Sequence, residues 1–358
     1  MTAGYEVHAG LSQGEGAGMR YLSVCSGIEA ATQAWHPLGW RPVAFSEIEP
    51  FPSAVLAHHY PNVPNWGDMT RFEEWPDEPV DLLCGGTPCQ SFSVAGLRQG
   101  LADPRGNLML TFGAIAGRYR PRWVVYENVP GILSSNGGRD FGSLLGMLGQ
   151  LGYGTAYRVL DAQYVRTRRF PFAVPQRRRR VWVVGYLGDW RRAAAVLFDR
   201  ESLSGDPAPR RETRQVAAPT LSARTKGGGG LGTDFDCDGG LITSTGDVAH
   251  CLNAGGMGRQ DYGTETMVAH THDTANIRAA SGGSSRSYVA QPWAVRRLTA
   301  EECEALQGFP RQFTRIPYRG KPASACPDGP RYKALGNSWA VNCAELIGER
   351  IMAAEGMA

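Results

Sequence analysis

The chain has 358 residues, of which 42% are hydrophobic and 20% are charged, and its formal net charge is +3. This is enough chain for one large folded domain or two ordinary ones. We expect no membrane span and no secretory leader, because the sequence has neither a run of about 18 apolar residues nor a basic N-terminal stretch followed by an apolar one. The eight cysteines include no CxxC pair, so we expect free thiols, no metal site and a cytoplasmic protein.

Short apolar runs alternate with helical stretches in the first half of the chain, which is typical of a parallel sheet with helices on its faces. We expect strands at residues 20–26, 41–47, 80–86, 122–128 and 179–186, with a weaker segment at 65–69. Small or acidic residues follow these strands: the turn Ser26-Gly27, then Glu47, Asp68, Cys89 and Glu127. Ligands of open α/β sheets bind outside the carboxyl ends of the strands, so we expect these positions to line one crevice.

The composition changes after Trp190. Residues 201–290 hold 15 glycines and only three aromatic residues, and the alternation of strands and helices disappears. We therefore expect a separate, loop-rich module there. A weak repeat, APTLSA against AHCLNA, suggests duplicated hairpins. Helical periodicity returns at 296–310 and in the final segment 340–354.

Arginines are concentrated in one stretch of the chain. Ten of them lie between Arg158 and Arg192, against only Asp161 and Asp189. A dense arginine block is what a phosphate-rich partner such as nucleic acid attracts. The alternative interpretation is a solvated basic face.

Cys89 lies in GGTPCQSFS, where two glycines and Pro88 predict a sharp turn at a strand end. A thiol is a useful nucleophile where it is exposed and partly ionised. No histidine is near it in the sequence, and the nearest acid at a strand end is Glu127 in YENVPG. A thiol paired with an acid suggests attack on an electron-poor ring. We expect four of the other cysteines to be small buried apolar residues, namely Cys25, Cys84, Cys303 and Cys343.

Five motifs together resemble those of DNA cytosine-5 methyltransferases. They are GGTPCQSFS, YENVPG, VPQRRRRVWVV, RRLTAEECEALQGFP and RYKALGNSWAV, in the order and at roughly the spacing of that family. The resemblance runs from Met19 to about Ile351, interrupted by the glycine-rich segment. The chain looks most similar to phage and prophage members.

The resemblance implies an α/β fold: a Rossmann-like domain that uses S-adenosylmethionine, with an inserted, loop-rich target-recognition domain. We expect the catalytic domain at residues 1–188 and 331–358, with 1–18 as a disordered extension. We expect the recognition domain at 189–330.

The resemblance also implies a reaction, the transfer of a methyl group to carbon 5 of a cytosine flipped out of a specific double-stranded DNA sequence. Cys89 matches the nucleophile that adds to carbon 6, and Glu127 matches the acid that protonates ring nitrogen 3. Arg178 and Arg180 match the arginines that brace the flipped base and the thiolate. The implied substrate-binding neighbours are Pro88, Gln90, Ser93 and Asn128.

The cofactor, S-adenosyl-L-methionine, has its own matching positions. They are Ser26, Gly27, Ile28, Glu47, Asp68, Leu108, Asn337 and Ser338. Glu47 matches the acid that bonds the ribose hydroxyls, and Asp68 the one that bonds the adenine amine. The chain departs from the family at the first turn, where CSGIEA has Cys25 and Glu29 in place of an aromatic residue and a glycine. We expect this departure to affect the packing of the cofactor more than the activity.

The partner implied by the resemblance is double-stranded DNA, with the chain acting as a monomer linked to a restriction system or a phage genome. Arg224, Lys226 and Arg259, flanked by glycines, are the expected contacts of the recognition module. The recognised DNA sequence does not follow from the chain, because a loop-rich module offers no helix to place in the groove.

Three other functions remain to be weighed. A nicotinamide oxidoreductase shares the sheet and the ribose-binding acid, but CSGIEA is not the expected GxGxxG. An RNA cytosine methyltransferase shares the motifs around Cys89 and Glu127, but we expect it to lack a long insert. A catalytically silent DNA-binding paralogue is the third, although Cys89, Glu127 and Asn337 are all present.

Overall fold

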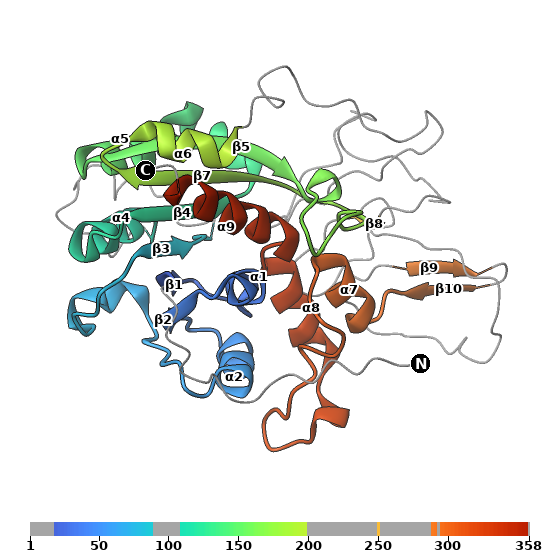
Figure 1. Ribbon diagram of the computed structural model, residues 1–358. Coiled ribbons are helices and arrows are strands. Elements are labelled where there is room, and N and C mark those ends of the chain that lie inside the picture. The colour runs from blue at the N-terminus through green and yellow to red at the C-terminus, as the bar shows by residue number, and fades with distance from the viewer. Residues whose placement is uncertain (1–17, 89–107, 199–248, 251–287, 292–293, 357–358) are drawn as a thin grey trace, which may run out of the picture.

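The computed structural model describes residues 18–88, 108–198, 249–250, 288–291 and 294–356. Within them, one large sheet carries helices on both faces, and the chain's last helix returns to this sheet (Figure 1). The order of strands is β2-β1-β3-β4-β7-β5. These strands are β1 (Arg20–Val24), β2 (Arg41–Ser46), β3 (Leu82–Gly85), β4 (Trp123–Asn128), β5 (Tyr153–Asp161) and β7 (Arg179–Leu187).

The first four strands are parallel, as expected, but β7 runs antiparallel to both of its neighbours, β4 and β5. The expectation of a wholly parallel sheet is therefore wrong for the second half. Strand β5 is also absent from the expected strands, because it lies at the edge and buries only every third or fourth residue: Tyr153, Ala156 and Leu160. The weak segment at 65–69 forms only a single bridge, between Asn65 and Phe45.

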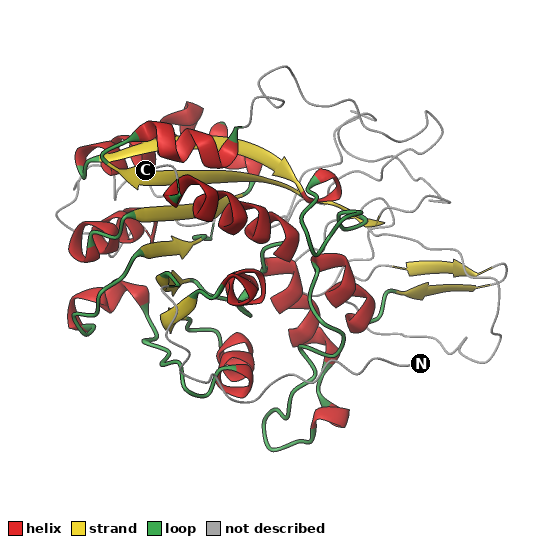
Figure 2. Cartoon of the chain, in the orientation of Figure 1, coloured by secondary structure: helices red, strands yellow, loops and turns green. Residues whose placement is uncertain are grey.

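Helices surround this sheet, as Figure 2 shows. They are α1 (Ala30–Trp35), α2 (Pro50–His59), α4 (Leu108–Tyr119), α5 (Arg139–Gln150), α6 (Trp190–Leu197), α7 (Ala300–Gln307), α8 (Asp328–Asn337) and α9 (Val341–Glu355). Two small sheets complete the described structure. They pair β9 (Tyr288–Gln291) with β10 (Ala294–Arg297) and β6 (Gln176–Arg177) with β8 (Ala249–His250).

Successive residues of the central strands point to opposite faces of the sheet. In β3, Leu82 and Cys84 join the core that α1, α6 and α9 cover, whereas Leu83 joins the core that α4 and α5 cover. In β4, Trp123 joins the core under α1, α6 and α9, and Val124 joins the core under α4 and α5. Both faces are buried, which explains why these strands are nearly continuous apolar runs in the sequence.

Helix α9 lies beside α1 and closes the first of these cores (Figure 1). The Trp35 indole donates a hydrogen bond to the Ala344 carbonyl at 2.8 Å. A Cβ at Gly348 would come within 2.5 Å of the Trp35 ring, so glycine permits this close approach of the two helices. The same core also includes Val196 of α6 and Phe313 of the segment between α7 and α8.

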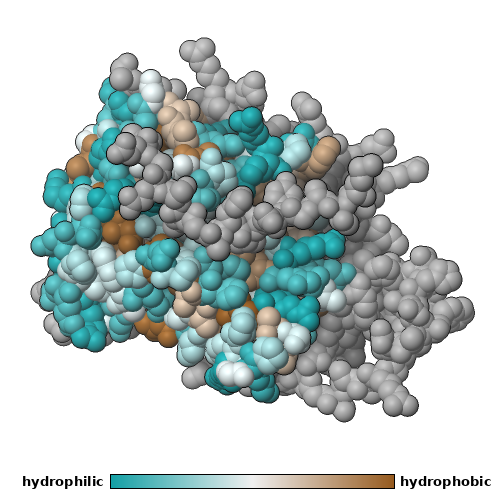
Figure 3. All heavy atoms as spheres, turned by 60° about the horizontal axis from the view of Figure 1, so that its bottom comes forward, coloured by the Kyte–Doolittle hydropathy of each residue, from teal (hydrophilic) through white to brown (hydrophobic). Residues whose placement is uncertain are grey.

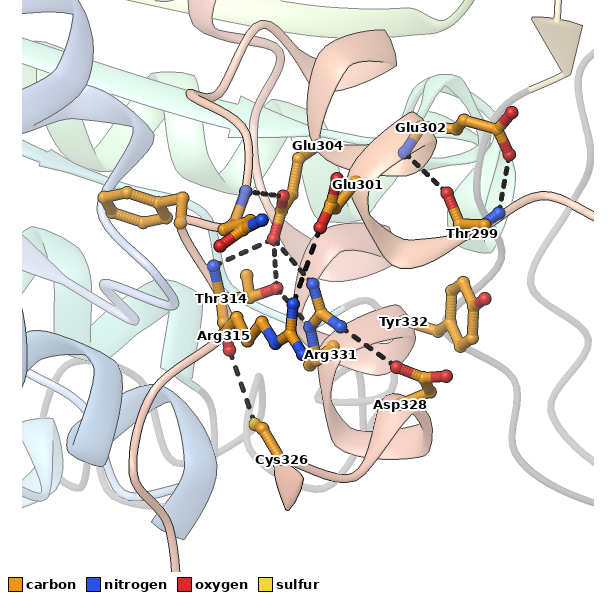
Figure 4. A network of polar contacts seen from close by, with 12 residues as sticks. Thr299, Glu301, Glu302, Glu304, Thr314, Arg315, Cys326, Asp328, Arg331 and Tyr332 are labelled. Carbon is orange, nitrogen blue, oxygen red and sulfur yellow. Dashed lines mark hydrogen bonds and ion pairs between the residues drawn. The ribbon is translucent and has the colours of Figure 1, made fainter. Parts of the chain in front are cut away.

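Helix α7 begins with a capping box, in which Thr299 and Glu302 exchange side-chain and backbone hydrogen bonds. On its inner side, the fully buried Glu304 accepts hydrogen bonds from the Thr314 backbone at 2.9 Å and from Arg331 of α8 at 3.2 Å. Arg331 also reaches Asp328 at 3.0 Å. Figure 4 shows this network, which ties α7, α8 and the segment between them into one unit.

Large apolar side chains on the described surface are scattered. They are Ile48, Tyr157, Tyr164, Phe172, Trp190 and Met352. On the face shown in Figure 3 the described residues are mostly hydrophilic, with separate small apolar areas. Among the described helices, none has the length and apolar character needed to cross a bilayer.

Candidate active site

The turn after β1 lies against the end of β2. The Gly27 N–H donates to Glu47 Oε2 at 2.8 Å, and the Ser26 N–H donates to the Ser46 carbonyl at 3.1 Å. Gly27 has a φ of 56°, a conformation that glycine adopts without strain. The structure thus brings together three predicted cofactor residues, Ser26, Gly27 and Glu47. The Ile28 side chain is fully buried in the core, so only its backbone can face a ligand.

Glu29, at the position where the family has glycine, takes a φ of 63°. Its buried carboxylate caps α1 by accepting the Thr32 N–H at 3.0 Å, and it also accepts the Ser23 hydroxyl. Burial raises the pKa of Glu29, and these hydrogen bonds oppose the shift. The left-handed backbone costs about 1–2 kcal/mol for a residue with a Cβ, which a side-chain cap worth about 0.5–2 kcal/mol can offset. The departure in the motif therefore replaces a glycine by a helix cap.

Glu47 and Asp68 flank the same turn. Glu47 accepts the backbone N–H groups of Ile48 and Glu49 through its other oxygen, and burial raises its pKa. Asp68 is exposed and caps the short helix Met69–Glu74. Burial, together with the carboxylates of Glu47 and Asp68, raises the pKa of the Cys25 thiol to about 12. Cys25 is therefore neutral at physiological pH, and both acids lie within electrostatic reach of the predicted cofactor turn.

Glu127 is a buried acid at the end of β4. Its Oε1 lies 3.1 Å from Arg180 Nε in an ion pair, and within the described residues this oxygen has no hydrogen-bond partner. Burial raises the pKa of Glu127, whereas Arg180, Arg178 and a hydrogen bond from the Trp339 indole lower it. An acid held in this way can keep its proton to a higher pH than a surface carboxyl group. Glu127 thus has the environment of a proton donor.

Asn128, next in the strand, holds the neighbouring loop. Its side-chain amide donates to the Thr87 carbonyl at 3.1 Å and to the Tyr126 hydroxyl at 2.9 Å. The Thr87 and Tyr126 hydroxyls are 2.6 Å apart. Asn128, predicted as a substrate contact, therefore fixes the chain two residues before Cys89 to the strand that carries Glu127.

The two predicted arginines have different partners. Arg180 faces Glu127. Arg178 is buried and donates from Nη2 to the carbonyls of Ser338, at 2.6 Å, and Gly336, at 3.2 Å. It thereby fixes the segment that contains the predicted cofactor residues Asn337 and Ser338, of which Asn337 is exposed and Ser338 is buried.

Several predicted site residues lie outside the described residues. These are Cys89, Gln90, Ser93, Arg224, Lys226 and Arg259. The described chain stops at the exposed Pro88 and resumes at the half-buried Leu108, the first residue of α4.

Much of the arginine block serves the fold, so its interpretation as one phosphate-binding surface is too simple. Arg169 bonds Glu345 of α9 and the Gln33 carbonyl. Arg158 bonds the Leu197 carbonyl at 3.0 Å. A count of charges along the sequence does not separate such internal contacts from solvated side chains.

The fold and the site define a Rossmann-like methyltransferase: an α/β sheet with an antiparallel strand near its edge, and acids at the carboxyl ends of β2 and β4. The Dnmt2 methyltransferase of S. pombe has a similar fold, with a TM-score of 0.57 and 16% identity, over 94% of this chain and 99% of that one. The family model described as C-5 cytosine-specific DNA methylase matches residues 19–353. The chain therefore belongs to the C-5 cytosine-specific DNA methylase family, a family of DNA cytosine methyltransferases whose methyl donor is S-adenosylmethionine.

Two relatives illustrate the range of similar proteins. A protein of Escherichia phage P1 described as a DNA N-6-adenine-methyltransferase is 33% identical, over 92% of this chain and 61% of the relative. A Type II methyltransferase of Bacillus subtilis is 27% identical, over 94% of this chain and 76% of the relative. The chain thus spans about three fifths of the phage relative and three quarters of the bacterial one.

Proposed function

We propose that the protein methylates carbon 5 of a cytosine in a specific double-stranded DNA sequence through a covalent adduct with Cys89. The observation that carries this proposal is Glu127, a buried acid whose Oε1 faces Arg180. Asn128, the next residue, donates a hydrogen bond to the Thr87 carbonyl. This bond ties the strand that carries Glu127 to the residue two positions before Cys89. A thiol beside a proton-donating acid suits addition to an electron-poor ring.

The steps follow from these groups. The Cys89 thiolate forms a bond to carbon 6 while Glu127 gives a proton to ring nitrogen 3, which makes carbon 5 nucleophilic. S-adenosylmethionine supplies the methyl group that carbon 5 accepts. Carbon 5 then loses its proton to a water molecule, the Cys89 sulfur departs as a thiolate, and ring nitrogen 3 returns its proton to the Glu127 carboxylate, which restores both the ring and the acid. The raised pKa of Glu127 favours the proton-bearing form that the first step requires.

The residues at the first turn fit S-adenosylmethionine. Glu47 holds the Gly27 N–H and lies at the carboxyl end of β2, where an acid can accept ribose hydroxyl groups. Asp68 lies near the same turn, because its carboxylate and that of Glu47 both raise the pKa of the Cys25 thiol. Ser338, from the last of the sequence motifs, is held in place because its carbonyl accepts a hydrogen bond from Arg178. We infer that this turn is the cofactor site.

We propose narrower boundaries for the target-recognition domain than residues 189–330. Val196 of α6 and Cys303 of α7 belong to the core that α9 closes, which supports their assignment to the catalytic domain. The recognition module then falls between 199 and 297. A monomeric state, a link to a restriction system or phage genome and a cytoplasmic location stay predictions.

Methylation of host DNA tests the proposed function. DNA and RNA from a host that lacks cytosine methylation, and that expresses the chain, should be analysed for modified nucleosides and by bisulfite sequencing. We expect 5-methylcytosine in DNA, confined to one sequence context, and none with the Cys89→Ser control. N6-methyladenine alone would instead assign this chain the chemistry named for the phage P1 relative. Modification of RNA alone would favour the RNA enzyme.

Glu47→Gln is expected to weaken binding of S-adenosylmethionine about 10- to 100-fold, because a hydrogen bond to a charged group contributes about 1.5–3 kcal/mol. Titration calorimetry measures this change. The matched control is Glu49→Gln, which alters an exposed acid paired with Lys333 at 3.0 Å and should leave the affinity unchanged. Equal affinities in both variants would contradict the role of Glu47.

A further inference from the structure

Trp339 lies in GNSWAV, between α8 and α9, and has no part in the steps above. Its ring packs edge-on against Trp182 of β7, with ring centroids 4.9 Å apart, and lies 6.4 Å from the ring of Trp35 in α1. Trp182 is the cross-strand partner of Glu127 in the β4–β7 pair. The Trp339 ring is thus placed directly beside the strand position that carries the acid.

The polar edge of the Trp339 indole meets Glu127. Its N–H donates a hydrogen bond to the carboxyl group of Glu127. The two groups meet over Gly86, where an added Cβ would lie 3.3 Å from Trp339 Nε1 and 3.1 Å from Glu127 Oε2. Gly86 is three residues before Cys89, so glycine leaves room there for the contact between indole and acid.

The segment that carries Trp339 is held on its other side. Arg178 donates to the Gly336 and Ser338 carbonyls, and Ala340, which follows, is buried. The backbone next to Trp339 is therefore held, and its indole cannot turn away without loss of the packing against Trp182. Trp339 is therefore a fixed donor.

We propose that Trp339 is a positioning residue for Glu127, holding its carboxyl group in one orientation. An indole N–H can only donate, so it must face an oxygen that accepts. Oε2 lies beside this donor, while Oε1 lies 3.1 Å from Arg180 Nε, so these two groups hold the two carboxyl oxygens in place. The inference rests on the proposed function, in which Glu127 protonates the base.

The groups that face Glu127 define the expected pH effect. Arg178 and Arg180 lower its pKa, and Tyr126 and Cys343 lie within electrostatic reach of it. All of these remain when Trp339 is changed. The indole hydrogen bond favours the ionised carboxylate. Its loss should therefore raise the pKa of Glu127 and move the alkaline limb of the pH–rate profile upward.

The test compares single-turnover methyl transfer across pH in the wild type and in Trp339→Phe, which keeps a ring but removes the N–H. We expect an alkaline limb about one pH unit higher and a rate at neutral pH about tenfold lower, with unchanged affinity for S-adenosylmethionine. Trp190→Phe, the same change at an exposed position of α6, should match the wild type. Because phenylalanine is smaller, benzothienylalanine at position 339 provides a second variant in which only the N–H is replaced by sulfur.

The outcomes are distinct. An active wild type whose pH profile superimposes on those of both variants would overturn the positioning role and leave the proposed function intact. A lower rate with an unmoved limb would also overturn it, since loss of packing alone has that effect. A wild type that forms no 5-methylcytosine in DNA would overturn the proposed function and, with it, the role of Trp339.

Discussion

Duplex DNA with 5-fluorocytosine at the target position should become covalently attached to the protein in the presence of S-adenosylmethionine. The proposed reaction needs a proton to leave carbon 5 before the Cys89 sulfur can depart. Fluorine cannot leave as a cation, so the adduct should persist through denaturing electrophoresis. Peptide mapping should locate the bond at Cys89.

Three variants separate the parts of this prediction. Cys89→Ser should give no adduct, because a hydroxyl without an adjacent base is a far weaker nucleophile at neutral pH. Glu127→Gln should slow trapping about 10²- to 10⁴-fold, the usual contribution of a positioned acid. Cys326→Ser, at a half-buried thiol between α7 and α8, is the control and should trap normally. A stable wild-type enzyme that methylates this DNA but never forms the adduct would refute the mechanism.

Arg331→Met is expected to lower the free energy of unfolding by about 3–5 kcal/mol, because it removes one partner of a buried ion pair. Glu304, 3.2 Å from Arg331 in the wild type (Figure 4), would keep a fully buried carboxylate whose remaining donors among the described residues are Gln312 and Thr314. Urea unfolding at constant pH measures the change.

Two comparisons make this stability prediction specific. Arg20→Met breaks the exposed Arg20–Glu78 pair, 2.9 Å long, and should cost at most about 1 kcal/mol. The double variant Glu304→Met with Arg331→Met should recover much of the loss, since apolar pairs often replace buried ion pairs without penalty. An Arg331→Met protein as stable as the Arg20→Met protein would contradict the importance of the network.

The sequence predicts the strands that are apolar throughout and the acids that follow them. Glu47 and Glu127 lie at strand ends in the structure, as the order of the motifs and the spacing of the strands in the sequence predict. The direction of β7 could not be predicted in this way, because a buried strand has the same apolar pattern in either direction. The pattern of β5 was equally uninformative, since an edge strand buries few side chains.

Other features depend on contacts between distant parts of the chain. Arg178 stands among four consecutive arginines, and nothing in that run distinguishes the buried one. Trp339 adjoins a motif that is associated with the cofactor, so its contact with Glu127 emerges only in the folded chain, where the segment between α8 and α9 meets the end of β4. Glu29 was noticed as a departure, but its role follows from its backbone angle and from the Thr32 N–H it caps.

The position of α9 beside α1 has a consequence for synthesis on the ribosome. Trp35 and Ala344, which share a hydrogen bond, are 309 residues apart. The face of α1 that α9 covers therefore stays open while the 309 residues from Trp35 to Ala344 are translated, on the order of 15–60 s at usual elongation rates. During that interval chaperones can reach the sides of Trp35 and Trp182 that Trp339 and α9 later cover, and a ribosome that stalls before α9 would release a chain in which one of the two cores lacks its closing helix.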